Sequence, residues 1–202
     1  MKNFRDGGIH DRAVLTSAAT TRESLEEACP LSVTAIHDAH ADFVWRSLQR
    51  LGVHVTDIDD AFQEVFVIVH KRLHTYNGSS KLTTWLFGIC FRVVAGLRRR
   101  AWFRRARGLS EAADDLQAPE SGRPDALLAA EQARRTVHLV LDKMDLAKRA
   151  VFVMFEIEEL SSEEIAVTLG VPRGTVFSRL HAARQQFQSI LNRLDKLEGG
   201  IR

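Results

Sequence analysis

Acidic side chains gather near the C-terminal end of the chain, where paired carboxylates could in principle perform acid–base chemistry. Glu158 and Glu159 precede Ser161, and Glu163 and Glu164 follow it. Carboxylates at the start of a helix are favoured by the helix dipole. A serine followed three residues later by glutamate is the signature of a helix capping box. We therefore assign these acids to helix initiation, predict no catalytic residue and do not expect an enzyme.

Two pairs of histidines have spacings that could suit a metal ion. His37 and His40 lie one helical turn apart, and so do His70 and His74. A protein zinc site needs at least three ligands, which also come from cysteine or carboxylate side chains. Neither pair has such a companion. Half-buried helix histidines are the better interpretation of His37 and His40, and no metal is expected at His70 and His74. The sequence predicts no metal and no cofactor.

Basic side chains form a third group, and their pattern is typical of DNA binding. Residues 161–184 read as two helices, because Gly170 suits a left-handed helix end and Pro172 suits the start of a new helix. An apolar stripe runs along the second helix from Val176 to Leu194. Its polar and basic residues fall largely off that stripe: Arg173, Thr175, Ser178, Arg179, His181 and Arg184. This is the helix-turn-helix pattern, with a helical hairpin in an ordinary bundle as the alternative.

A second basic segment lies at residues 98–107, which hold six arginines together with Trp102 and Phe103. A solvated run of charge is the plain interpretation of such a segment. Aromatic residues interleaved with arginine, upstream of a helix-turn-helix, favour a nucleic-acid contact instead.

The elements that would position these groups are helical. The chain of 202 residues is 45% hydrophobic and has only four prolines and twelve glycines, which argues against disorder and against an all-β fold. Gly52 is expected to end the first helix, and Thr56 is expected to cap the second. Before the helix-turn-helix, helical periodicity of apolar residues is visible in five segments: 32–52, 56–73, 82–97, 125–142 and 146–157.

The fold class predicted is all-α, with two small helical domains joined by a flexible acidic linker. Residues 1–30 show little periodicity and are expected to form a loose tail. Residues 31–107 form the first domain, and residues 125–195 form the second, which contains the helix-turn-helix. The linker, residues 108–124, is rich in acidic residues, glycine and proline.

Bulk composition narrows the function classes further. The net charge of +2 says little by itself about partners. Cys90 lies in an apolar helical run and is expected to be a buried thiol, and two distant cysteines make neither a disulfide framework nor a zinc cage. No apolar run approaches ~20 residues and no signal-peptide core is visible, so we expect no membrane insertion and a cytoplasmic protein.

Three segments resemble bacterial RNA polymerase sigma factors. Residues 60–66, DAFQEVF, are similar to the core-binding helix pattern D-x-x-Q-E-x-F. Residues 76–89 are similar to the promoter-melting segment, with an aromatic residue, a glycine turn and then W-L-x-x-I. Residues 161–180 resemble the pattern S-x-x-E-I-A-x-x-L-G-[IV]-P-x-G-T-V-x-S-R-L of the second DNA-binding domain. The small size resembles the extracytoplasmic-function (ECF) group of the sigma-70 superfamily.

The resemblance implies a set of site residues and partners. The core-polymerase contact, on the β′ clamp, would use Asp60, Gln63 and Glu64. The −10 promoter element would be held and melted by Tyr76, Asn77, Ser79, Ser80, Lys81, Trp85, Arg92, Arg98 and Arg99. The −35 element would be read by Arg173, Thr175, Ser178, Arg179 and Arg184, in a domain that also docks on the β flap. Promoter DNA and core RNA polymerase are therefore the expected partners, and an anti-sigma factor is a possible further one.

Arg92 departs from the family pattern, which often has asparagine there to help hold a flipped promoter base. Arginine only donates hydrogen bonds, whereas asparagine also accepts them. The alternative function is a stand-alone helix-turn-helix regulator, which would bind DNA as a symmetric dimer.

Overall fold

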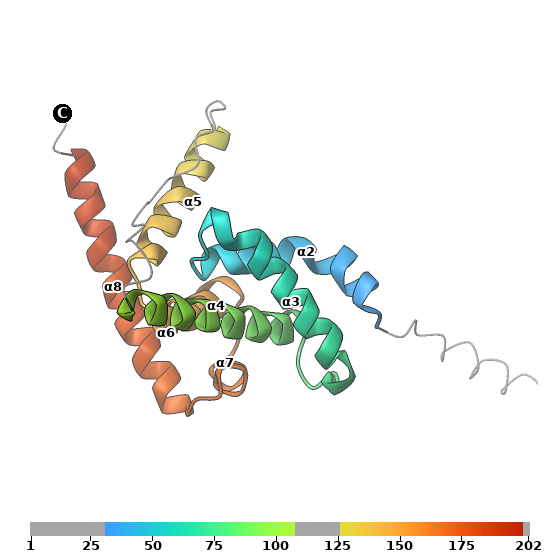
Figure 1. The fold of residues 1–202 in the computed structure, drawn as a ribbon. Helices are drawn as coiled ribbons and strands as arrows, with labels where there is room; N and C mark the ends of the chain where they lie inside the picture. Colours follow the sequence, from blue (N-terminus) through green and yellow to red (C-terminus); the bar gives the residue numbers. More distant parts are fainter. Residues whose placement is uncertain (1–30, 108–125, 200–202) are drawn as a thin grey trace, which may run out of the picture.

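The computed structural model describes residues 31–107 and 126–199. The tail 1–30 and the linker 108–124 predicted from the sequence lie outside these described residues. Within them the secondary structure is helical and no strand is found, which confirms the all-α fold class. The α-helices are α2 Val33–Arg50, α3 Ile58–Arg72, α4 Leu82–Ala106, α5 Ala126–Asp142, α6 Leu146–Phe152, α7 Ser162–Leu169 and α8 Arg173–Gly199 (Figure 1).

Helices α2, α3 and α4 pack on one another as an N-terminal bundle. Ser32 caps α2 by accepting a hydrogen bond from the Ala35 N–H, and Gly52 follows its end with a φ of 81°. The prediction that Thr56 caps the next helix is wrong. His54 accepts from the Thr56 N–H instead, because a short 3-10 turn, Val55–Asp57, precedes α3. A second 3-10 turn, Leu73–Thr75, follows α3 and leads into the loop before α4.

The C-terminal half consists of α5 to α8. Asp145 caps α6, which confirms the break expected near Met144 and Asp145. A π-helical turn, Val153–Ile157, extends α6 without a break in the chain. The sequence pattern did not predict this turn, since apolar spacing alone does not distinguish one π turn from an α-helical one.

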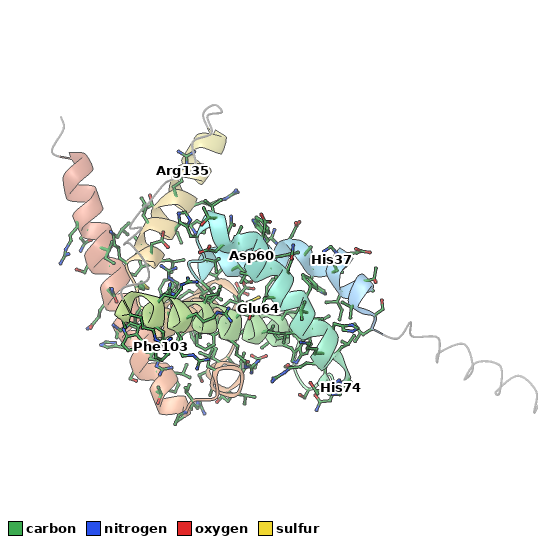
Figure 2. The ribbon with its side chains drawn as sticks, in the orientation of Figure 1. His37, Asp60, Glu64, His74, Phe103 and Arg135 are labelled. Carbon is green, nitrogen blue, oxygen red and sulfur yellow. The ribbon has the colours of Figure 1, made fainter. Side chains whose placement is uncertain are left out.

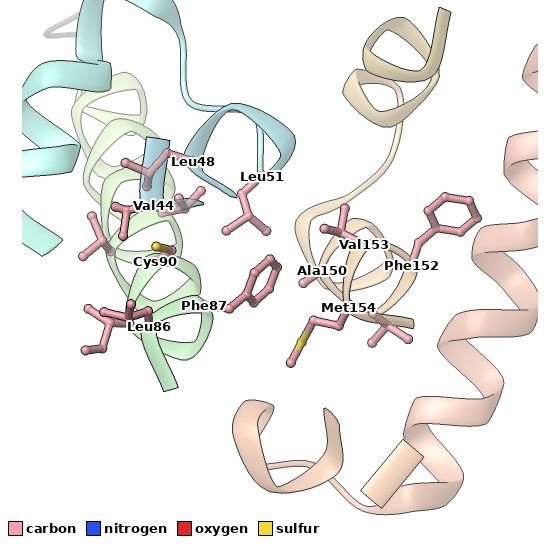
Figure 3. Close-up of a cluster of buried hydrophobic side chains, with 14 of the residues drawn as sticks. Val44, Leu48, Leu51, Leu86, Phe87, Cys90, Ala150, Phe152, Val153 and Met154 are labelled. Atoms are coloured by element: carbon pink, nitrogen blue, oxygen red, sulfur yellow. The ribbon is translucent and has the colours of Figure 1, made fainter. Parts of the chain in front are cut away.

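The two halves are in contact, and their buried side chains form one cluster. Figure 3 shows Leu51 and Phe87 of the N-terminal bundle facing Ala150, Val153 and Met154 of the C-terminal half. All five side chains are buried. The buried side chains of the two halves thus form one cluster, and the division of the chain into two domains stays a prediction.

Cys90 lies inside the N-terminal bundle, as predicted. Its side chain is fully buried, and burial raises the pKa of its thiol to about 12. A thiol with such a pKa stays protonated and unreactive near neutral pH.

Candidate nucleic-acid and polymerase interface

The loop between α3 and α4 is held in shape by its own polar groups. The Tyr76 hydroxyl donates to the Ser80 carbonyl over 2.8 Å, and the Ser79 N–H donates to Asn77 Oδ1 over 3.1 Å. Gly78 has a φ of 72°, in the left-handed region that suits glycine. The Tyr76 ring lies 5.4 Å from the ring of Trp85 on α4. The loop therefore presents a fixed aromatic pair beside small polar side chains.

A cavity of about 210 Å³ opens beside this loop. Two aromatic rings and several hydrogen-bonding groups surround it, which is the combination that holds an unstacked base. Six of the residues predicted for the −10 site line it: Tyr76, Asn77, Ser79, Ser80, Trp85 and Arg92. Val167 and Thr168 of α7 also line it, a contribution that no pattern in the sequence indicated.

Arg92 is exposed on α4 at the edge of this cavity. Partial burial of its guanidinium, and then the charge of Arg72, lower its pKa, although it stays protonated near neutral pH. Two neighbouring arginines make this edge positive. An anionic or carbonyl-rich partner fits there, and a partner that must donate to the side chain does not.

The remaining residues assigned to the −10 site lie outside this cavity. Lys81 is exposed and lines a smaller cavity with Glu158 and Leu160. Arg98 reaches back to α2, where it donates to the Leu51 carbonyl over 3.2 Å. Arg99 is exposed on α4. The structure thus does not gather all nine predicted residues in one site.

The predicted polymerase contact lies on α3. Asp60 and Gln63 are exposed, whereas Glu64 accepts from Arg100 of α4 over 2.9 Å. Figure 2 shows Asp60 and Glu64 on this helix. The sequence predicted an unpaired polar patch, but the Glu64 side chain has an internal partner. Sequence spacing could not reveal a pair between two different helices.

The end of α4 presents aromatic rings beside arginines. Trp102 and Phe103 are 61% and 50% exposed, and their ring centroids lie 5.0 Å apart in a T-shaped arrangement. Large aromatic side chains at the surface often mark an interface. The arrangement is consistent with the nucleic-acid contact predicted for this segment.

Of the two histidines predicted to be half-buried, His40 is half-buried, whereas His37 is exposed, so that prediction is wrong for His37. His70 and His74 are also exposed. His37 lies against Phe62 and Phe66, with its ring 4.8 Å from that of Phe66. Among the described residues, no group of three metal-binding side chains is found.

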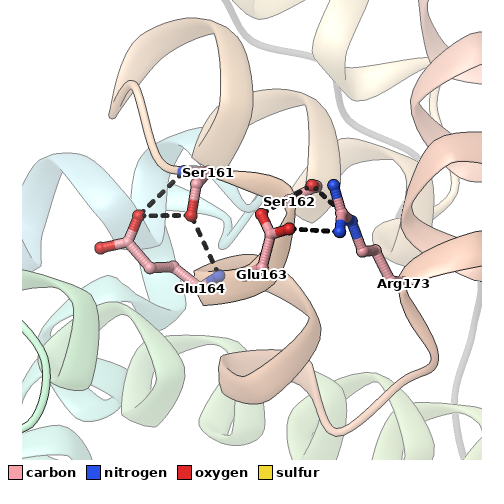
Figure 4. Close-up of polar contacts among 5 residues, drawn as sticks. All are labelled: Ser161, Ser162, Glu163, Glu164 and Arg173. Atoms are coloured by element: carbon pink, nitrogen blue, oxygen red, sulfur yellow. Dashed lines mark hydrogen bonds and ion pairs between the residues drawn. The ribbon is translucent and has the colours of Figure 1, made fainter.

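The helix-turn-helix has the local geometry that its sequence predicts. Ser161 Oγ accepts from the Glu164 N–H, and Glu164 Oε2 accepts from the Ser161 N–H over 2.9 Å, which completes the capping box (Figure 4). The backbone N–H of Ser161, followed by its hydroxyl, lowers the pKa of Glu164. Gly170 ends α7 with a φ of 65°. Helix α8 begins at Arg173, directly after Pro172.

The outward face of α8 is partly engaged with its neighbours. Arg173 pairs with Glu163 and donates from Nε to Ser162 Oγ over 3.2 Å, as Figure 4 shows. Arg184 pairs with Glu156 over 2.6 Å. Arg179 is half-buried and has no ion pair with any described residue, which leaves its guanidinium available to a ligand. Thr175 is half-buried and Ser178 is exposed on the same helix.

Two family models match the chain in the order of these two surfaces. Residues 36–107 match Sigma-70 region 2, and residues 134–187 match Sigma-70, region 4. The chain belongs to the sigma-70 family.

Curated relatives agree with this assignment. The ECF RNA polymerase sigma factor SigE of Mycolicibacterium smegmatis is 34% identical over 152 residues, which cover 75% of this chain and 58% of SigE. SigL of Mycobacterium tuberculosis is 29% identical, over 79% of this chain and 89% of SigL. The matched segment thus spans little more than half of the length of SigE.

Two solved structures share the fold. CnrH, solved in complex with the cytosolic domain of CnrY, has a TM-score of 0.54 and 25% identity, covering 80% of this chain and 88% of CnrH. RpoE of Bartonella quintana, solved with the anti-sigma factor NepR, has a TM-score of 0.56 and 19% identity, covering 77% of this chain and 98% of RpoE. The likeness to RpoE concerns the fold alone.

The cavity beside the α3–α4 loop is therefore lined mainly by region 2, with Val167 and Thr168 from region 4, and the outward face of α8 lies in region 4. Sequence reasoning missed the share that Val167 and Thr168 take in the region 2 cavity. No helix among the described residues is both long and apolar enough to cross a bilayer.

Proposed function

We infer that this chain is a sigma factor that binds core RNA polymerase and directs promoter-specific initiation of transcription. The observation that carries this inference is the presence, in one chain, of two surfaces for DNA. One is the aromatic cavity beside the α3–α4 loop, and the other is the basic face of α8 after a capped turn. A protein that reads two promoter elements needs both.

The −10 element is assigned to the loop cavity. Bases of a separated strand stack on the Tyr76–Trp85 ring pair, while Asn77 and Ser79 offer hydrogen bonds and Arg92 offers a positive charge. The −35 element is assigned to α8, where Arg179, Ser178 and Thr175 face the major groove and Arg173 and Arg184 contact phosphates. The domain division at 31–107 and 125–195 is part of this proposal.

Core polymerase is needed because the chain alone cannot melt DNA. Unstacking costs ~1.4 kcal/mol per base step, so opening about ten steps costs ~14 kcal/mol. Stacking one captured base on an aromatic side chain returns only ~1–3 kcal/mol. The polymerase supplies the difference and the covalent chemistry, and the chain itself performs none. It acts in the cytoplasm, where promoter DNA and polymerase are found.

Contacts with polymerase are assigned to Asp60, Gln63 and Glu64 on the β′ clamp, and to the second domain on the β flap. An anti-sigma factor is a further proposed partner, because RpoE of Bartonella quintana was solved with one. This proposal comes from the likeness of fold and not from a surface of this chain.

Copurification with core polymerase, followed by transcription from a promoter pool, tests the function. The proposal predicts a stoichiometric complex and initiation at a defined subset of promoters. A protein that ignores core polymerase and binds a palindrome as a dimer would be a stand-alone regulator instead.

A further inference from the structure

An exposed aromatic side chain lies in the first turns of α8. Phe177 is 50% exposed, whereas Val176 and Leu180 on the inner face of the same helix are buried. Helix α8 is the second helix of the helix-turn-helix, and the N-terminal residues of such a helix contact base edges in the major groove. The residues assigned to the −35 element are all polar, so Phe177 adds an apolar group to this surface.

Arg173 holds the Phe177 ring in place from one helical turn away. Its guanidinium carbon lies 5.5 Å from the centre of the ring, within the range of a cation–π contact. The guanidinium is itself fixed, because Arg173 pairs with Glu163 and donates from Nε to Ser162 Oγ over 3.2 Å (Figure 4). A single exposed hydrophobic side chain needs no explanation. A ring held by an arginine that two residues of α7 fix is instead a preorganised surface.

Gly174 leaves open surface beside this ring. It precedes Phe177 by three residues, so the two positions are neighbours on the helix. Apart from the local helix backbone, no described atom lies within 4 Å of the place that a Cβ on Gly174 would occupy. Packing inside the described part of the chain therefore does not require glycine there. The missing side chain gives a base edge room to approach the Phe177 ring.

The chemistry of the ring narrows what it can recognise. The phenylalanine side chain has no hydrogen-bond donor or acceptor, so it cannot read the polar groups of the base edges. The thymine 5-methyl group is the apolar group of the major groove, and phenylalanine is one of the side chains that contact it. Every A·T pair carries one such methyl group. A contact with the ring therefore distinguishes A·T from G·C at one position.

We propose that Phe177 is a specificity-determining residue that recognises a thymine methyl group in the −35 element, and that Arg173 is a positioning residue that holds its ring. The inference rests on the sigma-factor function proposed for the chain, and it adds an apolar contact to the readout by Arg179 and Ser178. It predicts a preference for thymine over deoxyuridine, two bases that differ only in the methyl group.

Removal of single methyl groups from the DNA tests the contact without any change to the protein. The probe is a duplex promoter that the full chain with core polymerase selects from a −35 library. Each thymine of its −35 element, on either strand, is replaced in turn by deoxyuridine. At one position the wild-type protein should bind the deoxyuridine promoter about fourfold more weakly, the loss expected when one methyl group is returned to water. Competition titration of the complex with core polymerase measures this ratio.

Phe177→Ala links that methyl group to the ring. The variant should bind the thymine and deoxyuridine promoters equally at this position, because the apolar partner of the methyl group is gone. Its thermal stability should change little, since the side chain is half exposed. Leu139→Ala is the matched control, because Leu139 of α5 is also an exposed hydrophobic residue of the C-terminal half. The control variant should keep the discrimination of the wild type.

Arg173→Lys tests the positioning role. Lysine keeps the positive charge but lacks the planar guanidinium that lies over the ring. The variant should discriminate less between thymine and deoxyuridine, while the slope of log affinity against log salt, which reports phosphate contacts, stays the same. Equal weakening of binding to both DNAs would remove Arg173 from the positioning role.

The outcomes separate this inference from the proposed function. Promoter-selective binding without a deoxyuridine effect at any thymine would overturn the inference and leave the proposed function intact. The same discrimination in Phe177→Ala as in the wild type would also overturn it, since another group would then contact the methyl group. If the chain with core polymerase selects no promoter, the proposed function fails, and the inference that rests on it fails as well.

Discussion

The two DNA-binding surfaces are built in different ways. The helix-turn-helix depends on neighbours in sequence, because Ser161 and Glu164 cap α7, Gly170 ends it and α8 follows Pro172. The region 2 cavity combines a loop, one face of α4 and two residues of α7 that are distant in sequence. The first surface is therefore defined locally, whereas the second depends on contacts between segments that are distant in sequence.

The largest expected effect is on −35-dependent initiation, which is assigned to the α8 surface alone. Arg179→Ala should lower −35-dependent initiation by about 5- to 150-fold, since a bidentate arginine–guanine contact is worth ~1–3 kcal/mol. Binding to core polymerase should not change. Transcription from promoters with intact and scrambled −35 elements measures this effect. Arg193→Ala, an exposed arginine later on α8, is the matched control. An unchanged −35 preference would remove Arg179 from the readout.

A second test asks whether polymerase binding is independent of both DNA surfaces. Glu64→Lys should weaken core binding by about tenfold, while an exposed ion pair of this kind contributes only ~0.2–1 kcal/mol to stability. Fluorescence titration with core enzyme and a thermal melt measure the two quantities. Arg100→Ala removes the internal partner alone and serves as the control. Equal losses of stability and of core binding would assign Glu64 a structural role.

Substitution of Arg92 tests whether the cavity takes part in −10 recognition, and its expected effect is smaller. Arg92→Asn should change the preferred −10 base and reduce the slope of log affinity against log salt by about 0.7, the value for one single-strand phosphate contact. Selection from a −10 library at two salt concentrations measures both. Arg72→Asn removes the neighbouring positive charge outside the cavity and serves as the comparison. Identical sequence preference and salt slope would make Arg92 a surface residue without a role in readout.

The smallest expected effect is on stability, and it tests whether the helix-turn-helix depends on its own helix cap. Ser161→Ala should cost about 1 kcal/mol, the usual value of a lost N-cap. The cap also predicts a pH dependence, because the folded-state pKa of Glu164 lies below its ordinary value of 4.5. Its contribution is complete above pH 4.5 and is lost as the pH falls through the lower, folded-state pKa. Thermal melts between pH 7 and 3 should show less acid sensitivity in Glu164→Gln than in the wild type, and equal sensitivity would contradict this cap.

The sequence predicted the parts that depend on short-range rules. The capping box, the left-handed Gly170, the helix end at Gly52 and the buried Cys90 were all readable, because each depends on neighbouring residues or on apolar spacing. The Thr56 cap was wrong, since a 3-10 turn precedes α3 and His54 supplies the acceptor.

Contacts between distant segments could not be predicted in this way. The Glu64–Arg100 and Arg50–Glu158 ion pairs join segments that are distant in sequence, and no periodicity in the sequence encodes them. The role of α7 at the cavity depends on the packing of the two halves, which a single sequence does not determine. Assignment of residues to the −10, −35 and polymerase sites remains a prediction.

The central claim is that this chain gives core polymerase its promoter specificity. The most direct measurement is a gel-shift titration against a promoter pool at physiological salt, with and without core enzyme. The account predicts weak, unselective binding by the chain alone, because each surface neutralises few phosphates. With core enzyme, binding should become strong and promoter-specific, since the second DNA contact becomes intramolecular. Nanomolar, sequence-specific binding to a palindrome by a dimer without polymerase would contradict the claim.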